Sequence, residues 1–399
     1  MSANKGPLTG IRVLDLGRHM SCPTCGMTLG DLGAEVIKVE KVGWGDDTRH
    51  SGEIVDGVSI YFHAQNRNKK GITVDFRSEK GKELLRELIK KSDVLIENFR
   101  PGTMEKMGLS WEQVHELNPR LIMASISGYG AGSPYANRPG FDSMMSAASG
   151  IMDMNQSDDG MPRITGGIWF IDLMSGMWST ISILSALHRR ETTGIGQHID
   201  TAMYDACLYA LNVNIPYYDK TGIINRTTTI KSVYDAPAGI FKSKDSYVVC
   251  LTGSDGLFQR LLSIIDDPVL HDPKYKNQED RIVDENAEVL NAALARVIAE
   301  KTGDEWEELF ASVGIPGMKV KNVGDVLASP ASHTRYTTVD LDIPGLGPLT
   351  FSGTPLNFSD ETLEFHRAPE LGENNREVYG GLLGLSDEEI DELMAKKII

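Results

Sequence analysis

Residues 10–16 read Gly-Ile-Arg-Val-Leu-Asp-Leu, and residues 32–40 read Leu-Gly-Ala-Glu-Val-Ile-Lys-Val-Glu. Each stretch holds a short apolar run next to glycine or another small residue, which is typical of a buried β-strand. We expect strands over 12–16 and 35–39, with a helix over 22–32 between them. This order of strand, helix and strand predicts a parallel α/β sheet.

The same alternation continues along the chain. Apolar runs over 94–97 and 121–127 predict further strands, and amphipathic patterns over 80–91 and 110–117 predict intervening helices. Two longer helices are expected over 173–190 and 199–214, separated by a turn at Thr193-Gly194-Ile195-Gly196. The fold class is therefore α/β, with a doubly wound, Rossmann-like parallel sheet in a large domain.

Length and local pattern indicate a second, smaller domain. The 399 residues exceed the roughly 250–300 at which a single core stops growing. Composition changes over 222–239, which has the character of a linker, and 239–241 with 247–251 predict a hairpin. We expect a small α/β domain over about 225–325 and an ordered, helical C-terminal tail that includes 382–395.

Composition limits the partners and the compartment. The net charge of −16 argues against nucleic acid or an anionic membrane as a partner. Four cysteines are too few for a disulfide framework in a chain of this length, and the N-terminus lacks the apolar region of a secretion signal. We expect a cytoplasmic protein.

Asp172 is an isolated carboxylate in Gly166-Gly167-Ile168-Trp169-Phe170-Ile171-Asp172-Leu173-Met174-Ser175-Gly176-Met177. Burying an ionised carboxylate is costly unless the group is hydrogen-bonded or reactive. One reading is a helix N-cap, although Ser, Thr or Asn would serve that purpose equally well. The other reading is a catalytic nucleophile.

Three further motifs bear on the chemistry. Cys22 and Cys25 form a Cys-x-x-Cys at a helix start, where a redox pair is possible, but packing of small buried residues at a strand-to-helix turn is the favoured reading. The segment Gly128-Tyr129-Gly130-Ala131-Gly132 lacks dinucleotide-binding spacing and reads as a loop beside the site. The nine histidines show no metal spacing and no Ser or Cys triad is apparent, so no metal is expected.

Basic residues gather near the ends of the predicted N-terminal elements. Ligands bind at the carboxyl ends of the strands in open α/β sheets, and cations there could offset phosphate charge. The set comprises Arg18, Lys41, Lys69, Lys70, Arg77, Arg100 and Lys106.

Several ordered motifs together resemble the class III CoA-transferase family, which includes formyl-CoA and carnitine CoA-transferases. They are the stretches 10–16 and 32–40, Asn66-Arg67-Asn68-Lys69-Lys70, Glu97-Asn98-Phe99-Arg100-Pro101-Gly102, the region 172–206, and Arg367-Ala368-Pro369-Glu370-Leu371-Gly372. The resemblance implies that Asp172 is the nucleophile and that the CoA site contains Arg18, Lys41, Val74, Arg77, Asn98, Phe99, Arg100 and Lys106.

The resemblance also implies an organisation and an assembly. Residues 1–215 would begin the large domain, 225–325 would form the small one, and 326–399 would return to complete the large one. Two chains would form an interlocked homodimer.

The implied activity is transfer of CoA between an acyl-CoA and a small carboxylic acid through an aspartyl anhydride and an aspartyl-CoA thioester. Backbone amides of 128–132 or 166–167 are expected to stabilise the oxyanions. The run of glycines that formyl-CoA transferases carry in the small domain is missing between 214 and 251, which makes oxalate or formate doubtful.

Two alternatives stay open. A 2-methylacyl-CoA racemase would carry Gly-His-Asp where this chain reads Gly140-Phe141-Asp142, so one of its two bases is missing. A CoA-binding protein without chemistry would keep the basic residues but would not need Asp172.

Overall fold

The structure is a computed structural model that describes residues 6–157, 159–164, 167–226 and 235–399. The described residues divide into two compact units. The first unit takes in the chain up to 149, 167–210 and 331–399, and the second takes in the described parts of 150–166 and 211–330. The predicted domains 1–215, 225–325 and 326–399 stay a prediction of how the chain folds.

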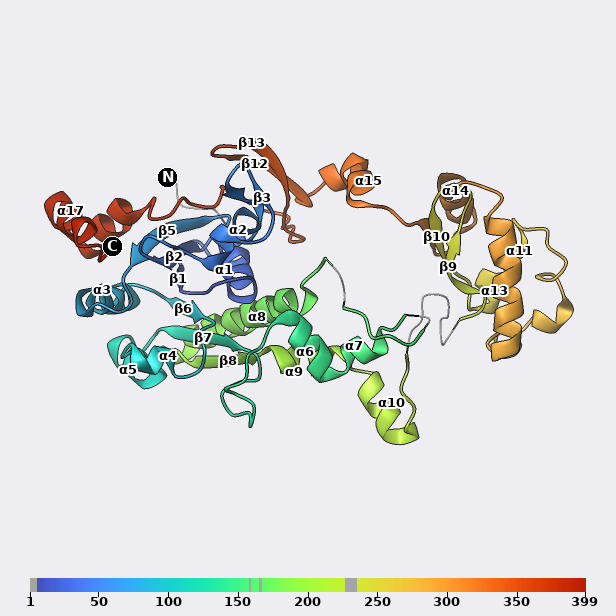
Figure 1. Ribbon diagram of the computed structural model, residues 1–399, viewed down its shortest axis with the longest axis horizontal. Helices are drawn as coiled ribbons and strands as arrows, with labels where there is room; N and C mark the ends of the chain where they lie inside the picture. Colours follow the sequence, from blue (N-terminus) through green and yellow to red (C-terminus); the bar gives the residue numbers. More distant parts are fainter. Residues whose placement is uncertain (1–5, 158, 165–166, 227–234) are drawn as a thin grey trace. The chain divides into compact units, whose positions relative to one another are not determined.

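The first unit is built on a six-stranded sheet in which every neighbouring pair is parallel, in the order β5-β2-β1-β6-β7-β8 (Figure 1). The predicted Rossmann-like sheet is confirmed. The strand order reverses between β1 and β6, and such a reversal opens a crevice at the carboxyl ends of the strands. The strands are β1 (Arg12–Asp15), β2 (Glu35–Lys41), β5 (Lys69–Val74), β6 (Val94–Glu97), β7 (Ile122–Ser127) and β8 (His198–Ala202).

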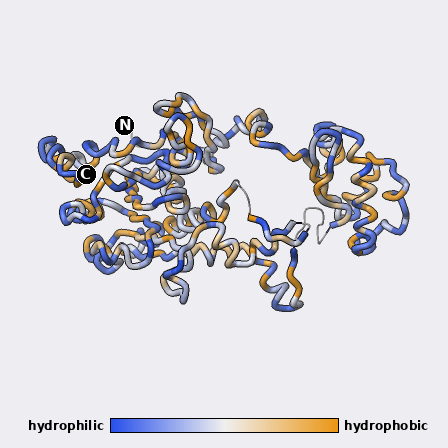
Figure 2. Tube along the Cα trace, viewed as in Figure 1, coloured by the Kyte–Doolittle hydropathy of each residue, from blue (hydrophilic) through white to orange (hydrophobic). Residues whose placement is uncertain are grey.

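Helices cover both faces of this sheet, and its central strands are accordingly buried on both sides. On one face, α1 (Ser21–Asp31) and α8 (Phe170–Thr193) pack against each other and against the strands. On the other face, α3 (Glu79–Lys90) and α5 (Trp111–Leu117) enclose a core that includes Leu14, Ile37 and Leu95. Figure 2 shows the hydrophobic segments concentrated in the strands between these layers.

The C-terminal segment closes the β5 edge of the sheet. Asn374 exchanges hydrogen bonds with Gly71, since its Oδ1 accepts from the Gly71 amide at 2.9 Å and its own amide donates to the Gly71 carbonyl at 2.9 Å. Thr73 donates its amide to Asn375 Oδ1 at 2.9 Å. An open edge presents unpaired backbone groups to other chains, so these bonds protect the sheet. The segment continues through η4 (Arg376–Gly380), α16 (Gly381–Leu383) and α17 (Asp387–Ala395).

Two segments differ from the prediction. The helix expected over 199–214 is wrong in its first part, because His198–Ala202 forms the edge strand β8; it is followed by α9 (Met203–Ala210) and α10 (Asn214–Thr221). Strand β5 was not predicted, since it begins with two lysines and carries a glycine. Both are edge strands, whose sequences are less uniformly apolar than those of central strands.

The second unit contains the predicted hairpin, formed by β9 (Ala238–Lys242) and β10 (Tyr247–Leu251), with β11 (Gly317–Lys319) paired to β10. Helices α11 (Asp255–Leu262), α13 (Asp284–Ile298) and α14 (Gly303–Val313) contribute to its core. The middle of the predicted linker, 227–234, lies outside the described residues.

The remaining elements are distributed over the two units. They are η1 (Asp47–His50), β3 (Ile54–Val55), β4 (Val58–Ser59), α2 (Ile60–Gln65), α4 (Thr103–Lys106), α6 (Asp142–Ser149), α7 (Ile151–Met154), η2 (Pro273–Tyr275), α12 (Gln278–Arg281), α15 (Val323–Ala328), η3 (Pro330–His333), β12 (Thr338–Ile343) and β13 (Gly347–Ser352).

Helix α8 is long and apolar enough by composition to cross a membrane, and among the described residues it alone passes that test. Its packing on α1 and beside β7 and β8 explains the composition, because a helix that lies against a sheet needs an apolar face.

Candidate active site

The loops after β1 and β6 meet where the strand order reverses. The amide of Arg18 donates to Asn98 Oδ1 at 2.9 Å, and Asn98 Nδ2 donates back to the Arg18 carbonyl at 2.8 Å. This reciprocal pair joins the two loops that border the crevice. Asn98, predicted as a CoA-binding residue, thus orients the backbone of Arg18.

Buried ion pairs fix the loop after β1 from beneath. Lys38 Nζ donates to the Gly17 carbonyl at 2.8 Å and lies 3.0 Å from Asp46 Oδ2. Lys69 Nζ lies 2.8 Å from Asp15 Oδ2, and both side chains are fully buried. A buried charge needs such a partner, so Lys69 serves the interior of the protein and is not available to a ligand phosphate. Lys70 pairs with Glu35 and Glu377 instead.

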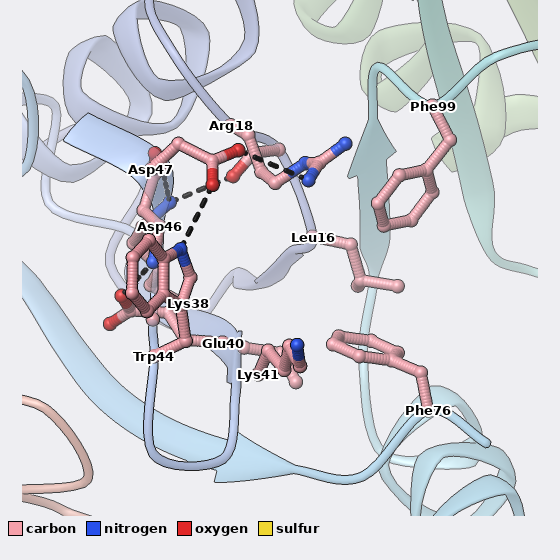
Figure 3. A pocket seen from close by; sticks show the side chains of 13 residues that line it. Leu16, Arg18, Lys38, Glu40, Lys41, Trp44, Asp46, Asp47, Phe76 and Phe99 are labelled. Carbon is pink, nitrogen blue, oxygen red and sulfur yellow. Dashed lines mark hydrogen bonds and ion pairs between the residues drawn. The ribbon is translucent and has the colours of Figure 1, made fainter. Parts of the chain in front are cut away.

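A first cavity of about 240 Å³ opens beside these loops. Figure 3 shows Leu16, Phe76 and Phe99 along one side of it, with Trp44, Lys38 and the carboxylates of Asp46 and Asp47 on the other. The Phe76 and Phe99 rings meet edge to face, with centroids 6.2 Å apart. Arg18 and Lys41, two of the predicted CoA-binding residues, also line it. Aromatic walls with cations at the rim suit a flat ring that carries phosphates.

A second cavity, of about 270 Å³, contains Asp172 and shares Arg18 and Phe99 with the first. The structure therefore brings Asp172 together with several of the predicted CoA-binding residues. The lining residues are Arg18, His19, Ser21, Asn98, Phe99, Arg100, Pro101, Ile126, Ser127, Gly128, Ala136, Arg138, Pro139, Gly140, Phe141, Asp172 and Met203.

Asp172 lies near the N-terminus of its own helix and faces the N-terminus of another. Burial raises its pKa to about 6, and the nearby charge of Asp142 adds to the increase. Hydrogen bonds from the side chain and the backbone of Ser21, the first residue of α1, oppose this shift. The carboxylate is therefore more basic than an ordinary aspartate yet mostly ionised at neutral pH.

The N-cap interpretation of Asp172 is wrong. Helix α8 begins at Phe170, and its N-cap position is Trp169, which makes no side-chain capping bond. Asp142 of α6 takes that part, since its Oδ2 accepts from the Ile171 amide at 2.7 Å and from the Asp172 amide at 3.2 Å. The Asp172 carboxylate is thereby free for other contacts.

Gly176 allows α8 to approach α1. A Cβ atom at this position would lie 2.5 Å from the Ser21 carbonyl oxygen and 3.1 Å from Thr24 Cβ. Residues four apart on a helix share a face, so the close approach at Gly176 brings Asp172 to Ser21. A small residue at position 176, four residues after Asp172, is therefore needed for the close packing of α8 on α1.

The other predicted CoA-binding residues lie in different surroundings. Val74 has a fully buried side chain in the core beneath α3, with no surface for a ligand to contact. Arg77 and Lys106 are exposed and line neither cavity, whereas Arg100 is exposed at the second.

The Cys-x-x-Cys pair is inert in this environment. Cys22 and Cys25 are completely buried, as the packing interpretation predicts, and line neither cavity. Burial raises the pKa of the Cys25 thiol to about 12 and that of Cys22 well above its ordinary value. A thiol that stays protonated is a poor nucleophile.

Of the expected oxyanion donors, two amides are already engaged. The Gly130 amide donates to Ser127 Oγ at 3.0 Å and the Ala131 amide to Asp200 Oδ2 at 2.8 Å. Gly128 lines the Asp172 cavity. Gly166 lies outside the described residues.

Sequence reasoning missed several residues of the site. His19 adopts a left-handed backbone (φ 64°) and meets the Phe141 ring edge to face, with centroids 6.0 Å apart. Tyr61 stacks on Trp169 with centroids 5.7 Å apart, and burial together with the Asp172 charge raises the pKa of its hydroxyl. Arg138 lines the Asp172 cavity. A non-glycine residue with positive φ at a site is strained, a signal that only coordinates reveal.

Glu97 supports the loop that carries Phe99. Its Oε2 accepts from the Phe99 amide at 2.7 Å, and burial raises the pKa of this carboxyl to about 7. Among the described residues, no group of His, Cys, Asp and Glu side chains could hold a metal ion.

Comparison with known proteins gives a consistent result. Residues 8–375 match the family described as CoA-transferase family III. A succinyl-CoA–D-citramalate CoA-transferase of Chloroflexus aurantiacus is 34% identical over 399 residues, which cover 98% of each chain. An acetyl-CoA:oxalate CoA-transferase of Acetobacter aceti is 35% identical over 372 residues, or 92% of this chain and 94% of that one.

A solved structure of a CAIB/BAIF family protein from Brucella suis superposes with a TM-score of 0.84 at 36% identity, covering 95% of this chain and 100% of that one. The chain belongs to CoA-transferase family III.

Proposed function

We propose that this protein transfers CoA from an acyl-CoA to a carboxylic acid, with Asp172 as the nucleophile. One observation carries the proposal: a half-buried carboxylate of raised pKa lies in a cavity next to the strand-end crevice where this family would hold CoA. Membership of CoA-transferase family III supports a CoA thioester as the substrate.

The reaction proceeds by four balanced exchanges. The Asp172 carboxylate attacks the thioester carbonyl of the donor, which gives a mixed anhydride and CoA thiolate. The thiolate attacks the aspartyl carbonyl and releases the first acid, leaving an aspartyl-CoA thioester. The acceptor carboxylate attacks this thioester and again displaces the thiolate, which then attacks the acyl carbonyl of the new anhydride. The product is a new acyl-CoA with Asp172 restored.

The surroundings of Asp172 suit this role. A carboxylate of higher pKa is a stronger nucleophile, and a pKa of about 6 still leaves it ionised at neutral pH. The amide and hydroxyl of Ser21 can respond as charge leaves and returns to the carboxylate. The buried apolar residues Ile126 and Met203 would limit the access of water, which would hydrolyse an anhydride.

CoA would extend across the two cavities. The adenine would enter the first, between Phe76, Phe99 and Trp44, and the thioester would reach Asp172 in the second. Arg18 lines both cavities and its guanidinium lies 5.7 Å from the Phe99 ring centroid, so we expect it to bind the phosphates between them. Lys41 and Arg100 extend this cationic path.

A racemase remains the second candidate, and one observation bears on it. Phe141 stands where that reaction would need a histidine, yet His19 lies beside Phe141 in the same cavity. Deuterium exchange at the α-carbon of a 2-methylacyl-CoA, measured without any acceptor acid, separates the two. Fast exchange would support racemisation and count against transfer.

The observations define the reaction more narrowly than they define the acids that take part in it. The relative named for oxalate is about as similar to this chain as the relative named for D-citramalate, so identity alone does not choose an acceptor. We expect an acid larger than oxalate or formate, on the absence of the glycine run.

The proposed assembly is a homodimer acting in the cytoplasm. In the first unit, α8 and α9 expose Met177, Ile181 and Tyr209, which a second copy of the chain would cover. The four cysteines are free and buried, as in a reducing compartment. Light scattering after size exclusion would give the oligomeric state, and a monomer would refute the interlocked assembly.

The test of the nucleophile is covalent trapping. The enzyme is incubated with acyl-CoA and then with hydroxylamine, and Asp172 is examined by peptide mass spectrometry for the hydroxamate. Asp172→Asn, checked for deamidation back to Asp, should neither trap nor transfer. Full transfer activity in this variant would overturn the mechanism, and CoA binding without transfer on a broad acid panel would favour a binding protein.

A further inference from the structure

Asp47 places a carboxylate inside the first cavity, where CoA would bring phosphates. Its Oδ2 lies 3.2 Å from Arg18 Nη1, and its Oδ1 accepts a hydrogen bond from Trp44 Nε1 at 3.0 Å (Figure 3). The same Oδ2 lies 3.8 Å from His19 Nε2. Arg18, the cation that lines both cavities, therefore already has an anion beside it. A phosphate that reaches this guanidinium would have to displace Asp47 or lie against its charge.

The other carboxylates that line this cavity have internal partners. Asp46 is buried and its Oδ2 lies 3.0 Å from Lys38 Nζ. Glu40 accepts two hydrogen bonds from the guanidinium of Arg49, each at 2.8 Å. Both pairs hold the loop after β2 in place. Asp47 differs from these carboxylates, because its side chain is partly exposed and lies against a cation of the ligand cavity.

The local fold does not require a negative charge at position 47. Trp44 Nε1 needs only an oxygen acceptor, which the side chain of Asn would also supply. The ion pair of Asp47 with Arg18 is half-exposed on both sides, and such pairs contribute little to the free energy of folding. Within the cavity, by contrast, one carboxylate repels every phosphate that comes close to it. The charge of Asp47 therefore matters for ligand binding more than for stability.

We propose that Asp47 occupies the place of a CoA phosphate beside Arg18 before CoA binds, and that this internal competitor lowers the affinity of the protein for CoA. The inference rests on the proposed function, since it takes the first cavity as the nucleotide site. CoA would displace Asp47 from Arg18, whereas Lys41 of the same cavity has no ion pair among the described residues and binds without competition. Each reaction cycle ends with release of an acyl-CoA, so a lower affinity favours turnover.

The experiment measures the Kd of CoA by isothermal titration calorimetry with the full chain and its variants. Asp47→Asn keeps an acceptor for Trp44 and removes the charge, so the Kd should fall about three- to tenfold. Added salt should reduce this gain. Asp47→Glu keeps the charge and should not lower the Kd. Glu53→Gln is the matched control, because it makes the same change of net charge at an exposed residue that lines neither cavity.

Two smaller ligands separate competition between charges from a change in the shape of the cavity. Adenosine diphosphate carries phosphates and adenosine does not, although both present the same ring. Asp47→Asn should tighten binding of the diphosphate alone, as measured by NMR titration, and circular dichroism checks that each variant is folded. An equal gain for both ligands, an equal gain in Glu53→Gln, or no gain for CoA would overturn the role of Asp47 and leave CoA transfer intact. A wild-type protein that bound no CoA would overturn the proposed function as well.

Discussion

Asp142 holds the backbone of Asp172, since its Oδ2 accepts from the Asp172 amide at 3.2 Å and from the preceding amide of Ile171 at 2.7 Å. The charge of Asp142 also raises the pKa of the Asp172 carboxyl. One buried carboxylate therefore both positions the proposed nucleophile and makes it more basic.

Substituting Asp142 should separate these two effects. Asp142→Asn keeps an oxygen acceptor for the amides but loses the charge, so the pKa of Asp172 should fall and the acid limb of the kcat profile should move to lower pH. Asp142→Ala loses both bonds, worth about 0.5–2 kcal/mol for a cap, and kcat should fall about tenfold or more. The measurement is kcat from pH 4.5 to 8. If both variants kept the wild-type pH profile of kcat, Asp142 would neither position Asp172 nor raise its pKa.

Removing the Asp172 charge should stabilise the folded protein at neutral pH. The folded pKa of about 6 lies above the ordinary value of 3.8, so ionisation is unfavourable in the folded state and stability is lost as pH rises through about 6. Asp172→Asn should gain about 1–3 kcal/mol at pH 8, and the gain should vanish near pH 4. Thermal unfolding across this range is the measurement. Asp219→Asn, at an exposed aspartate, should show no such trend, and a pH-independent gain at Asp172 would contradict the explanation.

A methyl group at Gly176 should separate α8 from α1. The new Cβ of Gly176→Ala would lie 2.5 Å from the Ser21 carbonyl oxygen, so the helices must shift. We expect a loss of about 1–3 kcal/mol and a lower kcat, because Asp172 moves away from Ser21. The matched control is Gly256→Ala, in α11, where nothing lies within 4 Å of the new atom. That change should be neutral or stabilising by up to about 1 kcal/mol. Equal effects of the two substitutions would contradict the account of Gly176.

Basic residues near the cavities should differ in their effect on CoA. Arg100 lines the Asp172 cavity, whereas Lys106 is exposed and lines neither cavity. Arg100→Ala should raise the KM for acyl-CoA more than about tenfold and leave that for the acceptor less changed, since a charged hydrogen bond contributes about 1.5–3 kcal/mol. Added salt should also raise it. Lys106→Ala should have a smaller effect. If neither substitution nor added salt changed the KM for acyl-CoA, CoA would bind elsewhere.

The sequence predicted the central strands well because their signal is local. Strands β1, β2, β6 and β7 each hold a short cluster of apolar residues, and helices α3 and α5 are amphipathic over the predicted residues. The edge strands β5 and β8 escaped prediction, since one begins with Lys69 and Lys70 and the other alternates His198, Asp200 and apolar residues. What makes them strands is pairing with a neighbour, which no local pattern reveals.

The candidate site was predicted in part for the same reason. Asp172 stands out in the sequence, and Arg18, Asn98 and Phe99 belong to motifs. Asp142 and Ser21 could not be found, because they reach Asp172 from 30 and 151 positions away through packing of α6 and α1 against α8. Val74 was predicted at the CoA site, yet its side chain is turned into the core beneath α3.

The closure of strand β5 by the C-terminal segment sets an order for events on the ribosome. The amide of Gly71 bonds to a residue 303 positions later in the chain. At elongation rates of roughly 5–20 residues per second, the strand waits about 15 to 60 seconds for that partner to be synthesised. During this interval the nascent protein presents an unpaired edge of its sheet, an opportunity both for aggregation and for contact with a second nascent chain.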